Sequence, residues 1–232
     1  MHAVEKMLVK ALCPDLERLG FSWINAREMS VRRWDGGFDS FTWAAHPTHD
    51  DGGRLELIPL VGVRHDVVDD VVNQLGLVFG AGNQMFTTTV ERGLGYFPFS
   101  PSRNYVQYIR FAAAEGDVLR VSANMLAILK GEGGDFYEKY SSLLNCSVGL
   151  NEPVETKVHP LCNNFPRRAY YGIACSAIAE SDRLKSLVDQ YKSYVAKIAP
   201  AQRERVEKRI DDLISLLEGG RFQVRSATPL SY

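Results

Sequence analysis

The chain has 232 residues, of which 45% are hydrophobic and 24% are charged, and its formal charge at neutral pH is −1. This composition is that of a globular protein with one large domain or two small ones, and it excludes a disordered chain. The near-neutral charge argues against a protein whose main task is to bind a nucleic-acid backbone, because that task requires a clustered basic surface.

The four cysteines stand far apart and form no CxxC pair, which fits neither a zinc ribbon nor a disulfide scaffold: Cys13, Cys146, Cys162 and Cys175. We interpret them as reduced thiols of a cytosolic protein. The first residues lack the apolar segment and cleavage site of a signal peptide, and no apolar run approaches the roughly 20 residues of a membrane span. The sequence therefore predicts a cytoplasmic protein that contacts no membrane and needs no cofactor.

The first part of the chain is expected to form one helix and then strands. Residues 3–19 carry apolar side chains at helical spacing, Pro14 should kink or restart the helix, and Gly20 should end it. Runs rich in aromatic and β-branched residues predict strands over residues 21–24, 28–34, 38–45 and 55–63. Pro59 favours an edge or a bulge for the last of these, because proline cannot donate to a strand ladder.

The middle of the chain alternates helices and strands. Asp66 begins a helix that Gly76 ends. Strands are then expected over residues 85–91 and 105–111, and helices over residues 117–131 and 135–144. Residues 146–166 contain three prolines and little periodicity, which indicates an irregular segment.

The last part of the chain is expected to be helical, over residues 167–179, 184–198 and 200–217. The first of these helices is rich in small residues, which suits close packing against a neighbour. Strands grouped before helices favour an α+β fold, with a mainly antiparallel sheet, flanking helices and a C-terminal helical part. The expected organisation is a sheet domain over 1–150, a linker over 151–166, helices over 167–220 and a tail over 221–232.

Three short motifs follow one another in a recognisable order. They are LGF (residues 19–21), LGYFP (residues 94–98) and GDFYEKYSSL (residues 134–143). In this order the chain resembles, over roughly residues 5–145, a loose group of uncharacterised bacterial proteins of the domain-of-unknown-function type. Members of that group are similar to small accessory or immunity-type proteins, without established catalytic residues. The resemblance implies an α+β fold and a non-catalytic interaction protein whose partner is another protein.

The loop between the strands expected at 85–91 and 105–111 provides the candidate partner-binding residues: Arg92, Tyr96, Phe97, Phe99 and Arg103. Exposed aromatic side chains on a loop are typical of a recognition surface. The same rings can also fold back over an open end of the sheet and complete the core, so both interpretations stay open. If the loop is a site, the flanking arginines favour an acidic or planar partner.

Six side chains of metal-ligand type stand within a short stretch: His46, His49, Asp50, Asp51, His65 and Asp66. The candidate ligands among them are His46, His49, Asp50 and His65. A metal held there would make the protein a metal-dependent hydrolase or nuclease, which is the alternative function. A turn of histidine, aspartate and glycine is also what an exposed hairpin commonly contains.

Two further patterns give minor alternatives. Cys162 lies three residues after His159, but spacing alone does not establish a catalytic pair. The segment RRAYY (residues 167–171) combines basic and aromatic side chains that can stack nucleic-acid bases, which gives a third interpretation as a nucleic-acid-binding accessory protein. No motif names a reaction, and the sequence leaves the partner's identity and the oligomeric state open.

Overall fold

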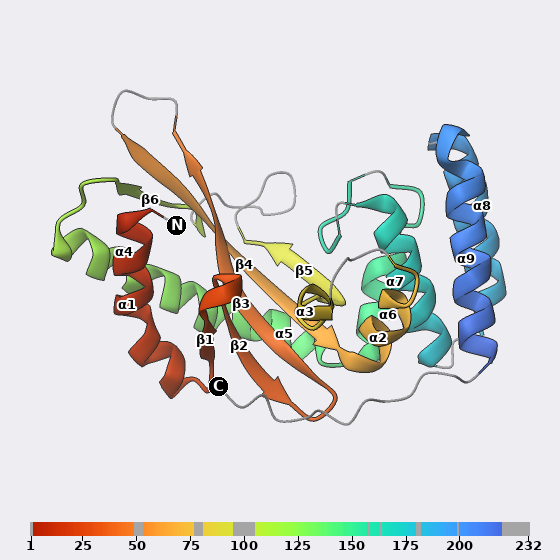
Figure 1. Ribbon diagram of the computed structural model, residues 1–232, viewed down its shortest axis with the longest axis horizontal. Coiled ribbons are helices and arrows are strands. Elements are labelled where there is room, and N and C mark those ends of the chain that lie inside the picture. The colour runs from red at the N-terminus through yellow and green to blue at the C-terminus, as the bar shows by residue number, and fades with distance from the viewer. Residues whose placement is uncertain are drawn as a thin grey trace. The chain divides into compact units, whose positions relative to one another are not determined.

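The computed structural model describes residues 2–48, 53–76, 81–94, 105–156, 158–162, 164–179, 182–198 and 200–219 (Figure 1). It confirms the α+β class, with an antiparallel sheet of six strands, flanking helices and a C-terminal helical part. None of the described helices is long and apolar enough to cross a membrane.

The chain divides into two compact units. The sheet unit comprises Met1–Trp34, Phe38–Gly62 and Arg92–Glu138, and the helical unit comprises Asp35–Gly37, Val63–Glu91 and Lys139–Tyr232. Residues 63–91 therefore cluster with the C-terminal helices, whereas the sequence pattern groups them with the strands.

In the sheet unit, helix α1 (Ala3–Arg18) buries an apolar stripe at helical spacing and packs against α4 (Glu115–Ile128). The helix continues through Pro14 rather than ending there. Pro14 and Lys10 both lie on the exposed side of α1, so water can bond the carbonyl that proline leaves without a donor.

The strands are β1 (Ser22–Ile24), β2 (Met29–Trp34), β3 (Gly37–Pro47), β4 (Arg54–His65), β5 (Val90–Gly93) and β6 (Gln107–Arg110). Their order is β1-β2-β3-β4-β5, and β6 pairs with β4. Strands β2 and β3 are joined by a turn at Asp35 and Gly36, where Gly36 has a φ of 87° that glycine adopts without strain.

Strand β4 is an interior strand, so the edge position expected from Pro59 is wrong. Its residues Arg54–Leu57 pair with β6, and beyond them the Leu94 N–H donates to the Pro59 carbonyl at 2.8 Å. Pro59 thus stands where one neighbouring strand ends and the next begins, and its missing N–H interrupts no continuous ladder.

The described helices of the helical unit are α2 (Asp66–Asn73), α3 (Ala81–Gln84), α6 (Leu143–Asn151), α7 (Phe165–Ile178), α8 (Leu184–Ile198) and α9 (Arg203–Glu218). Helix α7 packs against α2, α6, α8 and α9. A side chain at Gly172 would overlap Asn151 of α6, which confirms that this small-residue helix packs closely on a neighbour.

Two segments differ from their predicted secondary structure. The strand expected over 85–91 begins only at Val90, because the backbone N–H groups of Phe86 and Thr87 donate back to the Asn83 and Gln84 carbonyls in turns after α3. The helix expected over 135–144 is divided into α5 (Gly134–Tyr140) and α6, since the Ser142 side chain accepts the Asn145 N–H and starts a new helix.

Candidate functional site

The residues predicted to bind a partner lie mostly outside the described part of the chain. Tyr96, Phe97, Phe99 and Arg103 are outside it, and Arg92 is half-buried on β5. Beside Arg92, Leu94 is buried and bonded to β4, so the start of this loop is anchored in the sheet unit. The binding role of the loop stays a prediction.

The predicted metal ligands are divided between the two units. His46 is exposed in the sheet unit, His65 is buried in the helical unit, and His49 and Asp50 lie outside the described residues. His65 Nε2 lies 2.9 Å from the Tyr140 carbonyl oxygen, which only accepts, so this ring nitrogen carries the proton and offers no lone pair. Across the described ranges, no group of three or more acidic, histidine or cysteine side chains is placed to hold a metal ion.

One arginine and three carboxylates form a cluster of charge within the helical unit. We define the Arg64 cluster as Arg64 at the end of β4 with Asp66, Asp69 and Asp70 of α2. The guanidinium is bonded to Asp66 through Nε, lies 2.8 Å from Asp70 through Nη2, and lies 3.6 Å from Asp69 through Nη1. Residues 66, 69 and 70 share one side of a helix at spacings of three and four, so α2 presents all three carboxylates to one cation.

Asp69 links this cluster to distant parts of the chain. Its carboxylate is fully buried and accepts hydrogen bonds from the Thr89 hydroxyl at 2.6 Å and from the Tyr171 hydroxyl at 2.8 Å. Burial raises the pKa of Tyr171, and the neighbouring Asp69 charge raises it further, so the hydroxyl stays a donor. The cluster therefore ties α2 to the segment before β5 and to α7.

The electrostatics of the Arg64 cluster are those of a satisfied structural network. Burial lowers the pKa of Arg64, but the charges of Asp69, Asp66 and Asp70 and the hydrogen bond to Asp66 outweigh it, so the pKa is raised. Nη1 also donates to the Thr87 hydroxyl and to the Gln84 carbonyl, each at 2.8 Å. A cation held by so many acceptors stabilises the unit and offers little to a substrate.

The possible pair of Cys162 and His159 is not arranged for nucleophilic catalysis. Burial and then the Arg168 charge lower the pKa of His159 to about 4, and its Nδ1 accepts the Leu161 N–H at 3.2 Å. The Cys162 thiol donates to the Asn164 carbonyl at 3.5 Å, and burial raises its pKa. His159 Nδ1 is thus occupied, and the thiol is protonated at neutral pH.

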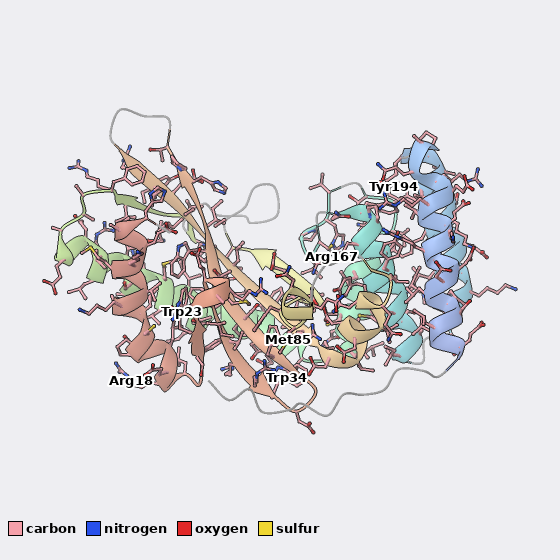
Figure 2. All side chains as sticks on the ribbon, in the orientation of Figure 1. Arg18, Trp23, Trp34, Met85, Arg167 and Tyr194 are labelled. Atoms are coloured by element: carbon pink, nitrogen blue, oxygen red, sulfur yellow. The ribbon has the colours of Figure 1, made fainter. Side chains whose placement is uncertain are left out.

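The basic-aromatic segment at residues 167–171 offers no face for base stacking. Arg168, Tyr170 and Tyr171 are buried. Arg167 (Figure 2) is half-buried, lies over the Tyr171 ring at 5.1 Å and donates to the Thr88 carbonyl at 3.0 Å. The pattern seen in the sequence therefore belongs to the packing of α7.

Helix α6 buries apolar and polar side chains on one face, Cys146 and Leu150 among them, and exposes two apolar side chains on the other. Leu144 and Val148 are 56% and 44% exposed, while Ser147 and Asn151 are buried against the rest of the unit. Leu144 and Val148 are four residues apart and therefore adjacent on the helix surface. This helix was not predicted from the sequence, which assigned most of its residues to an irregular segment. The leucine, cysteine and valine at helical spacing could have indicated it.

Comparison with protein-family models, with curated proteins and with solved structures found no match to this chain.

Proposed function

We propose that the protein acts by binding another protein, without catalysis, and that the outward face of α6 is part of the binding surface. The observation that carries the proposal is the exposure of Leu144 and Val148 on a helix whose opposite face is already packed against α7. A helix that is apolar on both sides is ordinarily covered on both sides. A non-catalytic protein-binding role is also what the resemblance to accessory and immunity-type proteins implies.

The position of α6 is fixed by close contacts on its inner side. The Asn151 side chain donates to the Gly172 carbonyl at 3.0 Å and accepts the Tyr191 hydroxyl at 2.8 Å. Gly149 lies so close to Tyr140 and Leu161 that a larger residue there would collide with both. Because α6 cannot rotate without breaking these contacts, its outward face is a preorganised surface, which lowers the entropic cost of binding.

The chemistry around the exposed pair favours an apolar partner surface. Of the exposed positions three or four residues from the pair, Ser141 and Asn145 carry no charge, and the charge of Glu152 is paired with Arg183 at 2.7 Å. The centres of protein interfaces are depleted in charged side chains in the same way. The predicted loop with Arg92 and Arg103 favours an acidic partner, so the two surfaces are separable by experiment.

The test is native mass spectrometry of the protein purified gently from its own host, as wild type and as the double variant Leu144→Glu/Val148→Glu. The matched control is Leu119→Glu, because Leu119 of α4 has the same 56% exposure as Leu144 but lies in the sheet unit. We expect a stoichiometric protein partner on wild type and control, and binding at least about tenfold weaker in the double variant.

A complex that survives the double substitution would contradict the proposal. Loss of the complex in the Leu119→Glu control alone would move the binding surface to α4. Circular dichroism of all three proteins checks that the exposed substitutions leave the fold intact, as surface changes ordinarily do.

A further inference from the structure

Arg168 is a buried cation with unused hydrogen-bond donors. Its side chain is 0% exposed in the first turns of α7. Nη2 donates to the carbonyls of Val154 and Thr156 at 2.6 and 2.8 Å, but Nε and Nη1 are buried without a hydrogen-bond partner among the described residues. Buried polar atoms are nearly always paired with protein or with an ordered group, so these two nitrogens indicate that something else binds there.

The charge of Arg168 is also uncompensated within the described ranges. No carboxylate forms an ion pair with it there, in contrast to Arg64. The ionisable groups that act on it most are Cys162, Tyr191 and Tyr194, which are thiol and phenol groups and neutral at pH 7. Burial lowers the pKa of Arg168, but a guanidinium stays protonated at neutral pH. A buried charge without a counter-ion is strongly unfavourable, so an anion there would stabilise the fold.

The surroundings of Arg168 favour an anion over a neutral group. The N-terminus of α7, a helix of 14 residues, adds the positive end of its dipole. The ring of Phe165 lies 5.4 Å from the guanidinium carbon and covers one side of it without neutralising it.

The chain that covers Arg168 is the irregular segment between α6 and α7. Its described residues form no helix or strand beyond the end of α6, and Arg168 itself bonds to two of its carbonyls. The site is therefore enclosed by this segment and by α7.

We propose that Arg168 is the centre of a binding site for a small inorganic oxyanion of phosphate or sulfate size. The unpaired N–H groups on Nε and Nη1 donate to it, and charge-assisted bonds from arginine to oxyanions are among the strongest hydrogen bonds in proteins. The bound anion completes the contact between α7 and the segment that covers it. This site is independent of the protein-binding face on α6.

The test is thermal unfolding of the full chain in sodium phosphate and in sodium chloride at matched ionic strength. The variants are Arg168→Met, which keeps the length of the side chain without its charge, and Arg168→Lys, which keeps the charge without the planar fork. Arg203→Met on exposed α9 is the matched control. We expect phosphate to raise the Tm of wild type and control more than chloride does, with a partial effect in Arg168→Lys and none in Arg168→Met.

Equal effects of phosphate and chloride on wild type would overturn the proposal, and so would an undiminished phosphate effect in Arg168→Met. If Arg168→Met does not fold, the difference between phosphate and chloride in the Tm of the wild type tests the proposal without it. The Nε–H resonance of Arg168, identified by its absence in Arg168→Lys, should shift on addition of phosphate and not of chloride. A resonance that does not move would indicate that water occupies the site instead.

Discussion

Arg64 and Arg168 are buried to nearly the same degree in the helical unit, at 4% and 0% exposure, but different groups surround their charges. Arg64 meets three carboxylates that follow it within six residues. Arg168 meets two backbone carbonyls that precede it by 14 and 12 residues, and its remaining nitrogens are unpaired. One cation is neutralised by carboxylates of its own stretch of sequence, and the other has no carboxylate partner among the described residues.

The difference separates two uses of a buried charge. A cation surrounded by its own carboxylates is a structural part of the fold, and removing it leaves anions buried without a partner. A cation with unused donors is available to a ligand, and removing it takes away the ligand rather than the fold. Substitutions at the two positions measure how far these arginines differ in their contribution to stability.

The largest effect is expected for Arg64→Met. The substitution leaves Asp69 fully buried without a cation, and the free energy of unfolding at pH 7 should fall by about 3–5 kcal/mol. Urea denaturation followed by circular dichroism measures the change. Arg120→Met is the control, since Arg120 forms an exposed pair with Asp117 and should cost about 1 kcal/mol or less. Equal losses in both variants would mean that the Arg64 cluster is not a structural centre.

A smaller loss of stability is expected when the protein is acidified and His159 becomes protonated. Its pKa is about 4 in the folded chain against an ordinary value of 6.5, so the unfolded chain binds the proton more readily. The free energy of unfolding is therefore highest above pH 6.5, where the ring is neutral in both states. It decreases by about 3 kcal/mol in total as the pH falls from 6.5 to 4.

The measurement for His159 is the pH dependence of urea unfolding in wild type and in His159→Gln, which cannot titrate. The wild type should lose stability relative to the variant between pH 6.5 and 4. Because the Arg168 charge contributes to the low pKa of His159, Arg168→Met should raise that pKa, so the loss of stability becomes smaller and is complete at a higher pH. Parallel curves for wild type and His159→Gln would show that His159 is not held neutral.

The smallest effect is expected for Arg168→Met in chloride buffer without phosphate. The variant loses two hydrogen bonds to carbonyls but also removes an unpaired charge, so the free energy of unfolding should change by less than about 2 kcal/mol. Chemical denaturation beside Arg64→Met gives the comparison directly. If Arg168→Met costs as much as Arg64→Met, the two arginines have the same structural role.

The helices with long apolar periodicity were predictable because their signal is local. The expected helix over 184–198 matches α8, and the small residues expected to allow close packing on α7 include Gly172, which lies against Asn151. The strand expected over 85–91 was placed too early, because Phe86 and Thr87 lie in turns that bond back to α3, where the Thr87 hydroxyl accepts from Arg64. Propensity within a short window contains no information about such distant partners.

The candidate sites were less predictable than the fold. The sequence drew attention to His65 as a metal-ligand type, but the Tyr140 carbonyl 75 residues away occupies its ring nitrogen. It drew attention to the aromatic residues after Arg168, but the packing of α7 buries them. It gave no reason to single out Leu144, because an exposed leucine and a buried one look the same in a sequence.

The sequence by itself determined the α+β class, the hairpin at Asp35 and Gly36, and the spacing that places Asp66, Asp69 and Asp70 on one side of a helix. These features depend on neighbours within a few residues, where backbone geometry alone sets the distances. The tertiary structure decided that Asp69 meets Tyr171, that α6 turns Leu144 outward and that Arg168 is enclosed without a counter-ion. Those outcomes depend on how whole helices pack, and packing brings together groups that are far apart along the chain.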